Sequence, residues 1–242
     1  MKILKELEKR LEKERNPKQA RILQGFFKTG SGQYGEGDIF LGIKVPIQRK
    51  IVKEFTGLGL RDIEILLNSK IHEKRLISLF LLIDKYKNAD KDEGEDGGKG
   101  KKSIFEFYLK NAKQINNWDL VDLSAPNIVG DWLLDKDKNI LYDLVKSDNL
   151  WEKRIAIVGS FSFIRSGKFE DTLKISELLL GDKHDLIHKA VGWMLREVGK
   201  RDEVILENFI KKNYFKMPRT TLRYAIERFE EGKRKRYLRG EI

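Results

Sequence analysis

One pattern constrains this chain more than any other: a basic residue followed by a tightly apolar, helix-like stretch recurs at a nearly constant spacing. Arg154 and Lys189 are 35 residues apart, and Lys189 and Arg223 are 34 apart. Apolar residues inside each stretch recur every three or four positions, which is the helical period. The recurring stretches occupy residues 73–83, 151–164, 187–198 and 219–229. A repeat of this length without strand signals predicts stacked helix pairs.

Two further positions extend the repeat toward the N-terminus. Asp119 precedes Arg154 by 35 residues, and Arg75 precedes Asp119 by 44. The excess matches residues 88–102, an acidic, then glycine-rich, then basic segment that we expect to be a flexible insertion between helices. The chain is therefore predicted to be all-α, a helical solenoid of the HEAT or armadillo type. The basic residues of the repeats would then line one groove.

The elements before the first repeat can be placed from local signals. Pro17 is suited to the first turn of a helix that runs to about Phe27, and Pro46 to the start of another. Residues 28–38 are glycine-rich but lack a phosphate-binding motif, so they are expected to form a connecting loop. An earlier helix is predicted from an apolar stripe of Ile3, Leu4, Leu7 and Leu11.

Composition narrows the function classes. Lys and Arg total 49 against 38 acidic residues, a formal charge of +11, which favours a polyanionic partner such as nucleic acid. The absence of cysteine excludes disulfides, thiolate metal sites and thiol catalysis. The histidines, His72, His184 and His188, lack metal-ligand spacing and are expected at the surface or as helix caps. No apolar run suffices for a membrane span, so a cytoplasmic protein without cofactor or metal is expected.

Trp118 and Asp122 form the most informative local pair. On a helix, a spacing of four places an indole and a carboxylate on one face, which suits a positively charged partner. The alternative is a Trp118 half-buried against the next helix, with Asp122 directed to solvent. If Asp122 is catalytic, replacing it by asparagine should barely move the melting temperature, whereas an Asp122 that only caps or pairs within the helix stack should lower stability when replaced. Superimposing the repeats brings Arg154 and Trp193 to neighbouring helices. Without a nucleophile, these groups favour electrostatic catalysis.

The segments that carry these residues resemble the AlkD family of DNA alkylation repair glycosylases. The resemblance spans about residues 17–230 and rests on NNWDLVDLSAPNIVGDWL (116–133), DNLWEKRIAIV (148–158), IHKAVGWMLREVGK (187–200) and FLGIKVPIQRK (40–50). It implies a single domain over 1–242, a right-handed superhelical solenoid of HEAT-like repeats with a concave DNA-binding face. A basic C-terminal tail is expected at 232–242.

The resemblance also implies an activity: hydrolysis of the N-glycosidic bond of cationic 7-alkylguanine and 3-alkyladenine in duplex DNA, without base flipping. Trp118 and Trp193 would contact the deoxyribose, Asp122 would stabilise the oxocarbenium ion, and Arg154 would grip a phosphate. Asn117 stands where relatives often carry an aromatic residue. The expected DNA-binding residues are Lys44, Arg49, Lys153, Lys189, Arg196 and Arg223.

Two other readings remain open at this stage. One is a noncatalytic HEAT-type module that binds DNA or RNA through the same groove. The other is a protein-binding scaffold, a frequent role of helical solenoids that fits the +11 charge poorly. The expected partner is double-stranded DNA containing alkylated purines, bound by a monomer associated with the nucleoid. A steep salt dependence of duplex binding would separate the nucleic-acid readings from the scaffold.

Overall fold

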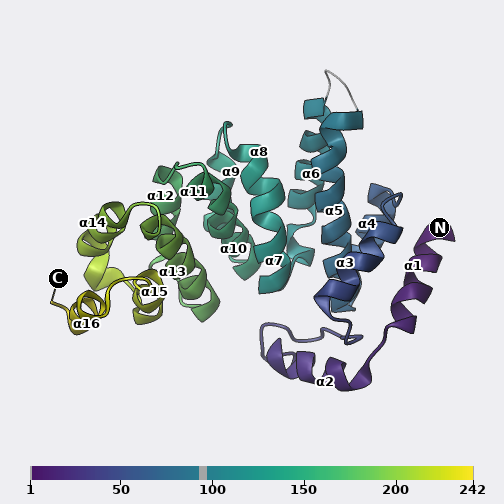
Figure 1. The fold of residues 1–242 in the computed structure, drawn as a ribbon, viewed down its shortest axis with the longest axis horizontal. Coiled ribbons are helices and arrows are strands. Elements are labelled where there is room, and N and C mark those ends of the chain that lie inside the picture. The colour runs from purple at the N-terminus through teal and green to yellow at the C-terminus, as the bar shows by residue number, and fades with distance from the viewer. Residues whose placement is uncertain (1, 93–96, 242) are drawn as a thin grey trace. The chain divides into compact units, whose positions relative to one another are not determined.

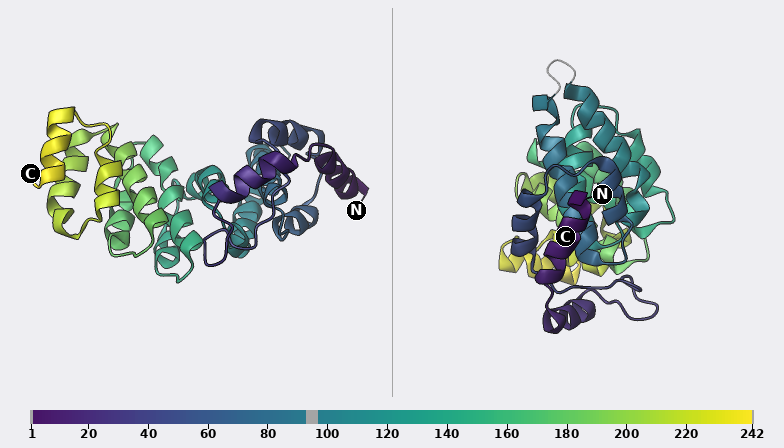
Figure 2. Two further views of the ribbon diagram at one scale, coloured as in Figure 1. Left: turned by 90° about the horizontal axis from the view of Figure 1, so that it is seen from below. Right: turned by 90° about the vertical axis from the view of Figure 1, so that its right-hand side faces the viewer.

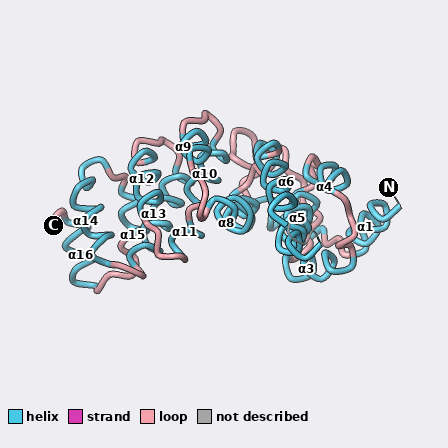
Figure 3. The backbone as a smooth tube through the Cα atoms, turned by 90° about the horizontal axis from the view of Figure 1, so that it is seen from above, coloured by secondary structure: helices cyan, strands magenta, loops and turns pink. Residues whose placement is uncertain are grey.

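The computed structural model describes residues 2–92 and 97–241, and the regular secondary structure of these residues is helical (Figure 3). A single isolated parallel bridge joins Ile39 to Ile71. The chain divides into two compact units, Met1–Leu120 and Val121–Ile242. The predicted all-α class is confirmed, and the arrangement of packed helices is consistent with a helical-repeat solenoid.

In the first unit, helices α3, α4 and α6 pack against the long helix α5, and α1 packs against α3 (Figure 1). Leu7 and Leu11 of α1 are fully buried, whereas Ile3 is 44% exposed and does not belong to the predicted stripe. The helices of this unit are α1 (Lys2–Lys13), α2 (Pro17–Phe26), α3 (Val45–Glu54), α4 (Leu60–Leu67), α5 (His72–Asp92), α6 (Gly97–Lys110), the 3-10 turn η2 (Ala112–Gln114) and the start of α7 (Trp118–Ala125).

Local signals explain several of these boundaries. The side chain of Asn16 caps α2 by accepting the backbone N–H of Gln19 at 3.0 Å, and Pro17 occupies the first turn as predicted. The expected insertion at 88–102 differs from a loop, because residues 88–92 continue α5 and residues 97–102 begin α6. Its centre, 93–96, lies outside the described residues.

In the second unit, α10 packs against α9 and α13, and α13 packs against α12, α14 and α15. Successive helices therefore lie side by side in chain order, as a helical repeat requires (Figure 2). The unit contains the end of α7, the π-helix η3 (Pro126–Gly130), α8 (Asp131–Leu133), α9 (Asn139–Val145), α10 (Leu150–Gly159), α11 (Phe161–Arg165), α12 (Glu170–Leu179), α13 (Asp185–Gly199), α14 (Glu203–Asn213), η4 (Tyr214–Lys216), α15 (Arg219–Ala225) and α16 (Glu231–Arg239).

Two glycines explain how tightly these helices pack. A Cβ on Gly192 of α13 would lie 2.7 Å from the carbonyl oxygen of Thr221 in α15. A Cβ on Gly130 of η3 would lie 2.1 Å from the carbonyl oxygen of Gly159 in α10. Both distances are shorter than van der Waals contact, so these helices can approach each other only at glycine.

The predicted basic tail at 232–242 is instead largely a docked helix. Tyr237 of α16 is buried, its ring lies 5.4 Å from that of Phe229, and its carbonyl accepts the hydroxyl of Tyr214 at 2.7 Å. Lys233 forms ion pairs with Glu203 and Glu207 of α14. The high positive charge of this segment suggested a tail, but the buried side chain of Tyr237 anchors it as a helix.

Candidate active site

Helix α7 carries the Trp118–Asp122 pair one turn apart. Asn117 is fully buried, and its side-chain oxygen accepts the backbone N–H of Trp118 at 2.8 Å. This contact holds the side chain of Asn117 against the backbone of the first residue of α7. A fully buried Asn117 offers no surface to a bound base.

The helix that starts at Trp118 does not remain α-helical beyond Ala125. Pro126 has no N–H for the carbonyl of Asp122 four residues earlier, and the chain continues as the π-helix η3. Ser162 donates its hydroxyl to the carbonyl of Pro126 at 2.6 Å. π-Helical segments are frequent at functional sites, because they redirect the side chains on either side.

The carboxylate of Asp122 is held by Arg154 of α10. Nε of Arg154 donates to Oδ1 at 2.8 Å and Nη2 donates to Oδ2 at 2.8 Å, a bidentate ion pair. The side chain of Asp122 is 19% exposed. The simple alternative of a solvent-directed Asp122 therefore does not hold: most of this side chain is covered and its orientation is fixed.

Arg154 is itself almost completely buried, at 5% exposure. Its Nη1 donates to the carbonyl of Leu186 near the start of α13 at 2.6 Å. The helix that carries it is capped by the side chain of Asn149, which accepts the N–H groups of Trp151 and Glu152. Arg154 thus joins α7, α10 and α13 within the second unit. These three hydrogen bonds use three of the five N–H groups of the guanidinium.

Trp118 lies among aromatic side chains of the first unit. Its ring stacks on Phe27 at 5.2 Å and meets the edge of Phe26 at 5.9 Å, and its indole N–H donates to the hydroxyl of Tyr34 at 3.2 Å. Tyr34 belongs to the glycine-rich loop at 28–38, which the sequence treated only as a connection. No local sequence motif identifies Tyr34 as a site residue, because its partner Trp118 is 84 residues away in the chain.

Trp193 is half-buried on α13, and its ring centre lies 5.8 Å from that of Phe161. Asp122, Arg154 and Trp193 belong to the second compact unit, whereas Trp118 belongs to the first. Superimposing the repeats placed Asp122 and Arg154 on neighbouring helices, and the structure adds a direct ion pair between them that the spacing did not predict. The convergence of all four residues on one substrate stays a prediction.

Three of the predicted DNA-binding cations are exposed. Lys44 precedes α3, Arg49 lies in α3 with its guanidinium carbon 4.2 Å from the ring centre of Phe80, and Arg223 lies in α15. An exposed cation can exchange water and counterions for a phosphate at little cost. These three side chains therefore fit the predicted role without rearrangement.

The other three predicted cations already have carboxylate partners. Nζ of Lys153 lies 2.8 Å from Asp182, Nζ of Lys189 lies 2.6 Å from Asp185, and Nη1 of Arg196 is bonded to Glu227. Each would have to share or exchange this partner to bind a phosphate. The predicted set thus divides into two classes that sequence spacing alone had treated alike.

The positions of the three histidines and of Arg75 can be compared with the surface or capping positions predicted for the histidines and the groove position predicted for the arginine. His184 caps α13 by accepting the N–H of Leu186, as expected, and His188 bonds the carbonyl of Asp182. The prediction was wrong for His72, which is 2% exposed, and for Arg75, which is buried against Asp38 rather than lining a groove. Among the described residues, no group of metal-binding side chains is assembled.

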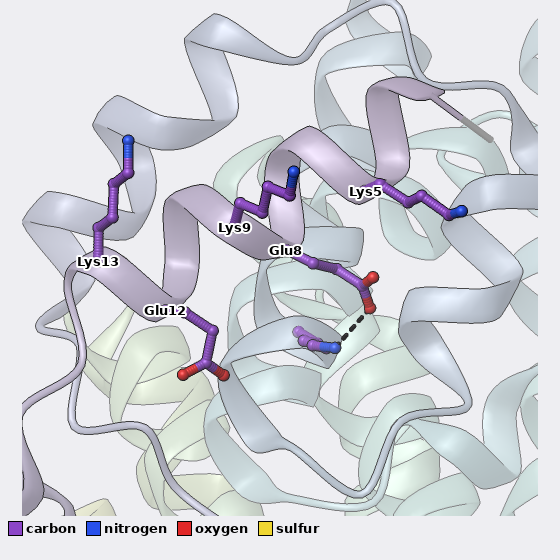
Figure 4. Close-up of a pocket in the computed structure, with 6 residues that line it drawn as sticks. Lys5, Glu8, Lys9, Glu12 and Lys13 are labelled. Atoms are coloured by element: carbon purple, nitrogen blue, oxygen red, sulfur yellow. Dashed lines mark hydrogen bonds and ion pairs between the residues drawn. The ribbon is translucent and has the colours of Figure 1, made fainter.

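Two surface hollows lie beside lysines. The larger, about 540 Å³, is in the first unit, where Glu8 of α1 pairs with Lys74 while Lys9 and Lys13 extend away from Glu8 (Figure 4). The smaller, about 410 Å³, is lined by Lys153, Gly181, Asp182, Lys183 and His184 in the second unit. The smaller hollow directly adjoins the helix that carries Arg154.

Comparison with known proteins decides the family. The family described as "DNA alkylation repair enzyme" matches residues 7–229. The chain belongs to this family. Its membership implies a role in DNA repair with DNA as the partner. No curated protein matches the sequence significantly.

A solved structure described as a predicted DNA alkylation repair enzyme from Enterococcus faecalis has the same fold. Its TM-score is 0.68 at 18% identity, and the match covers 90% of this chain and 98% of that one. At this identity the likeness concerns the fold alone. Within the described residues, no helix combines the length and apolarity needed to cross a membrane.

Proposed function

We propose that this protein is a DNA glycosylase that hydrolyses the N-glycosidic bond of cationic alkylated purines, 7-alkylguanine and 3-alkyladenine, in duplex DNA. The observation that carries the proposal is the bidentate pair between Asp122 and the buried Arg154, one helical turn from Trp118. A carboxylate held rigidly in a partly desolvated position is a means of stabilising positive charge that develops during a reaction.

The reaction places its charge where such a group helps. The bond between C1′ and the purine nitrogen breaks, and its electron pair neutralises the cationic base, which leaves without needing a proton. The sugar becomes an oxocarbenium ion, water adds to C1′, and the water loses a proton. Asp122 stabilises the sugar cation and orients the water, while the faces of Trp118 and Trp193 contact the deoxyribose. No step requires the base to enter a pocket.

Arg154 has two parts in this proposal. Its bidentate contact orients Asp122, and its remaining N–H groups grip the phosphate beside the lesion. A phosphate that approaches the guanidinium also weakens its hold on the carboxylate, which leaves more of the negative charge of Asp122 for the sugar. The exposed cations Lys44, Arg49 and Arg223 bind the duplex backbone, and the protein acts as a monomer.

The test is direct: incubate the protein with a duplex that contains 7-methylguanine and measure free base and abasic sites. Release of the base supports the glycosylase. The second candidate, a noncatalytic DNA-binding module, is favoured by the ion pair with Arg154, because the guanidinium already balances the charge of Asp122. It predicts salt-dependent binding of the same duplex without release of base.

A further inference from the structure

His72, the first residue of α5, is enclosed between two carboxylates from distant parts of the chain. Its Nε2 lies 2.8 Å from Oδ2 of Asp119 in α7, and its Nδ1 lies 3.4 Å from Oδ2 of Asp38 in the loop before α3. An ionised carboxylate can only accept hydrogen bonds, so both ring nitrogens must carry protons to face these oxygens favourably. The geometry therefore favours an imidazolium ion over a neutral imidazole.

The surroundings of His72 contain few other charges. From α5 itself, Arg75 donates to Asp38 at 2.6 Å, and Glu73 accepts the backbone N–H groups of residues 41–43. Burial lowers the pKa of His72, but the hydrogen bond and charge of Asp119, together with Asp38, outweigh it and raise the pKa above its usual value near 6.5. The pKa of Asp38 is lowered, because His72 and Arg75 outweigh the cost of its burial.

The same histidine completes an aromatic stack that ends at Trp118. The ring of His72 lies 4.6 Å from Phe40 and 4.9 Å from Phe27, and Phe27 stacks on Trp118 at 5.2 Å. Asp119, the ionic partner of His72, directly follows Trp118 in the chain. Trp118 is therefore tied to His72 twice within the first unit, through its ring by Phe27 and through its backbone by Asp119.

We propose that His72, as an imidazolium ion, is a positioning residue that holds Trp118 in place for base excision through Asp119 and Phe27. The proposal rests on the glycosylase function proposed above, since that function gives Trp118 its part in the reaction. His72 touches neither base nor sugar. Its effect is to keep the first turn of α7 and the indole ring in one orientation.

The sign of the pH dependence follows from the raised pKa. For a group whose pKa is higher in the folded protein, the stabilisation is fully present below the unfolded value near 6.5 and is lost as pH rises through the folded value. Above that pH, a neutral ring donates to only one carboxylate, and Asp38 and Asp119 no longer share a cation. Trp118 loosens, and excision slows under alkaline conditions.

The experiment combines two readouts that do not require activity with one that does. Nitrogen NMR of the His72 ring follows its protonation in the wild-type protein. The fluorescence difference between wild type and Trp118→Phe follows the environment of Trp118. Single-turnover excision of 7-methylguanine is measured over the same pH range, with uncatalysed base loss subtracted. We expect His72 to carry two protons at pH 7 and all three signals to change together at higher pH.

Asp119→Asn removes one charge and keeps the shape of the side chain. It should move all three transitions down by about 1–3 pH units, the usual effect of losing one adjacent opposite charge. The matched control is Asp171→Asn, which alters a carboxylate of α12 that accepts the hydroxyl of Tyr142 at 2.7 Å. The control should leave all three transitions where they are.

Distinct results separate the two proposals. A His72 ring with one proton at pH 7, or Trp118 fluorescence that ignores its titration, overturns the positioning role even if Asp119→Asn is unstable. Excision that proceeds with a pH profile unrelated to His72 overturns it as well. If the protonation of His72 and the fluorescence of Trp118 change together but no base is released at any pH, the positioning role of His72 is supported and the glycosylase function is rejected.

Discussion

The carboxylates of Glu73 and Asp122 are held in different ways in the two units. Glu73 is 1% exposed and accepts three backbone N–H groups of residues 41–43 at 2.8–3.2 Å. Asp122 accepts two N–H groups of the Arg154 guanidinium and keeps part of its surface in solvent. The oxygens of Glu73 accept backbone N–H groups of the same unit. The carboxylate of Asp122 is fixed in orientation but remains partly accessible to solvent. A charge that is fixed without being enclosed is the kind that can act on a substrate.

The burial of Glu73 also explains the sequence of the segment that surrounds its carboxylate. Gly42 has a φ of +84°, and a Cβ there would lie 2.1 Å from the carbonyl oxygen of Asn16. The segment FLGIK at 40–44 therefore wraps around a buried carboxylate and holds α2 against the loop. Residues 40–43 are buried in the first unit, while Lys44 at the end of the segment is exposed to solvent.

The largest effect is expected for Asp122→Asn. Removal of one preorganised charge should slow single-turnover excision by a factor on the order of 10²–10³. The bidentate contact with Arg154 also weakens, so stability should fall by about 1–3 kcal/mol. This replaces the expectation from sequence that the melting temperature would barely move. Rates are therefore compared per folded molecule, with Asp171→Asn as the control. Excision near the wild-type rate would remove the distinction between the two carboxylates.

Glu73→Gln should give the opposite pattern. The amide can accept fewer of the three N–H groups and leaves a buried site poorly satisfied, so unfolding by denaturant should show a loss of about 1–3 kcal/mol. The excision rate per folded molecule should stay at the wild-type level. A fall in excision comparable to that of Asp122→Asn would mean that Glu73 is more than structural.

Replacing single surface cations should have a smaller effect, and its size should depend on whether the cation is already paired with a carboxylate. Arg223→Gln should make the slope of log binding constant against log salt concentration less steep by about one, because an exposed cation that binds a phosphate releases a counterion from the DNA. Arg196→Gln should change this slope less, since Arg196 is bonded to Glu227. Binding of undamaged duplex is measured at several salt concentrations. Equal slopes for the two variants would show that the ion pair opens on DNA.

The sequence predicted what depends on regular spacing. The repeat placed Asp122 and Arg154 on the helices α7 and α10, although it did not predict the ion pair that joins them. Helix α2 was predicted because Pro17 is a local signal. Both inferences use short-range or periodic information, which a single sequence contains.

What the sequence did not predict depends on pairs without a period. His72 meets Asp38 and Asp119, which are 34 and 47 residues away, and no spacing rule links the three. Tyr34 reaches Trp118 from 84 residues away in a loop that was defined only by its glycines. In the segment 232–242, a high charge hid the one aromatic residue, Tyr237, that docks α16.

In the proposed reaction, fixed negative charge suffices for excision without a general acid or a base-binding pocket. This is tested most directly by offering the wild-type protein matched duplexes that carry 7-methylguanine, 3-methyladenine or uracil, and by measuring released base in single turnovers. We expect release of the two cationic purines and none of uracil, whose departure needs charge neutralisation at the base. Efficient release of uracil would contradict the proposed reaction.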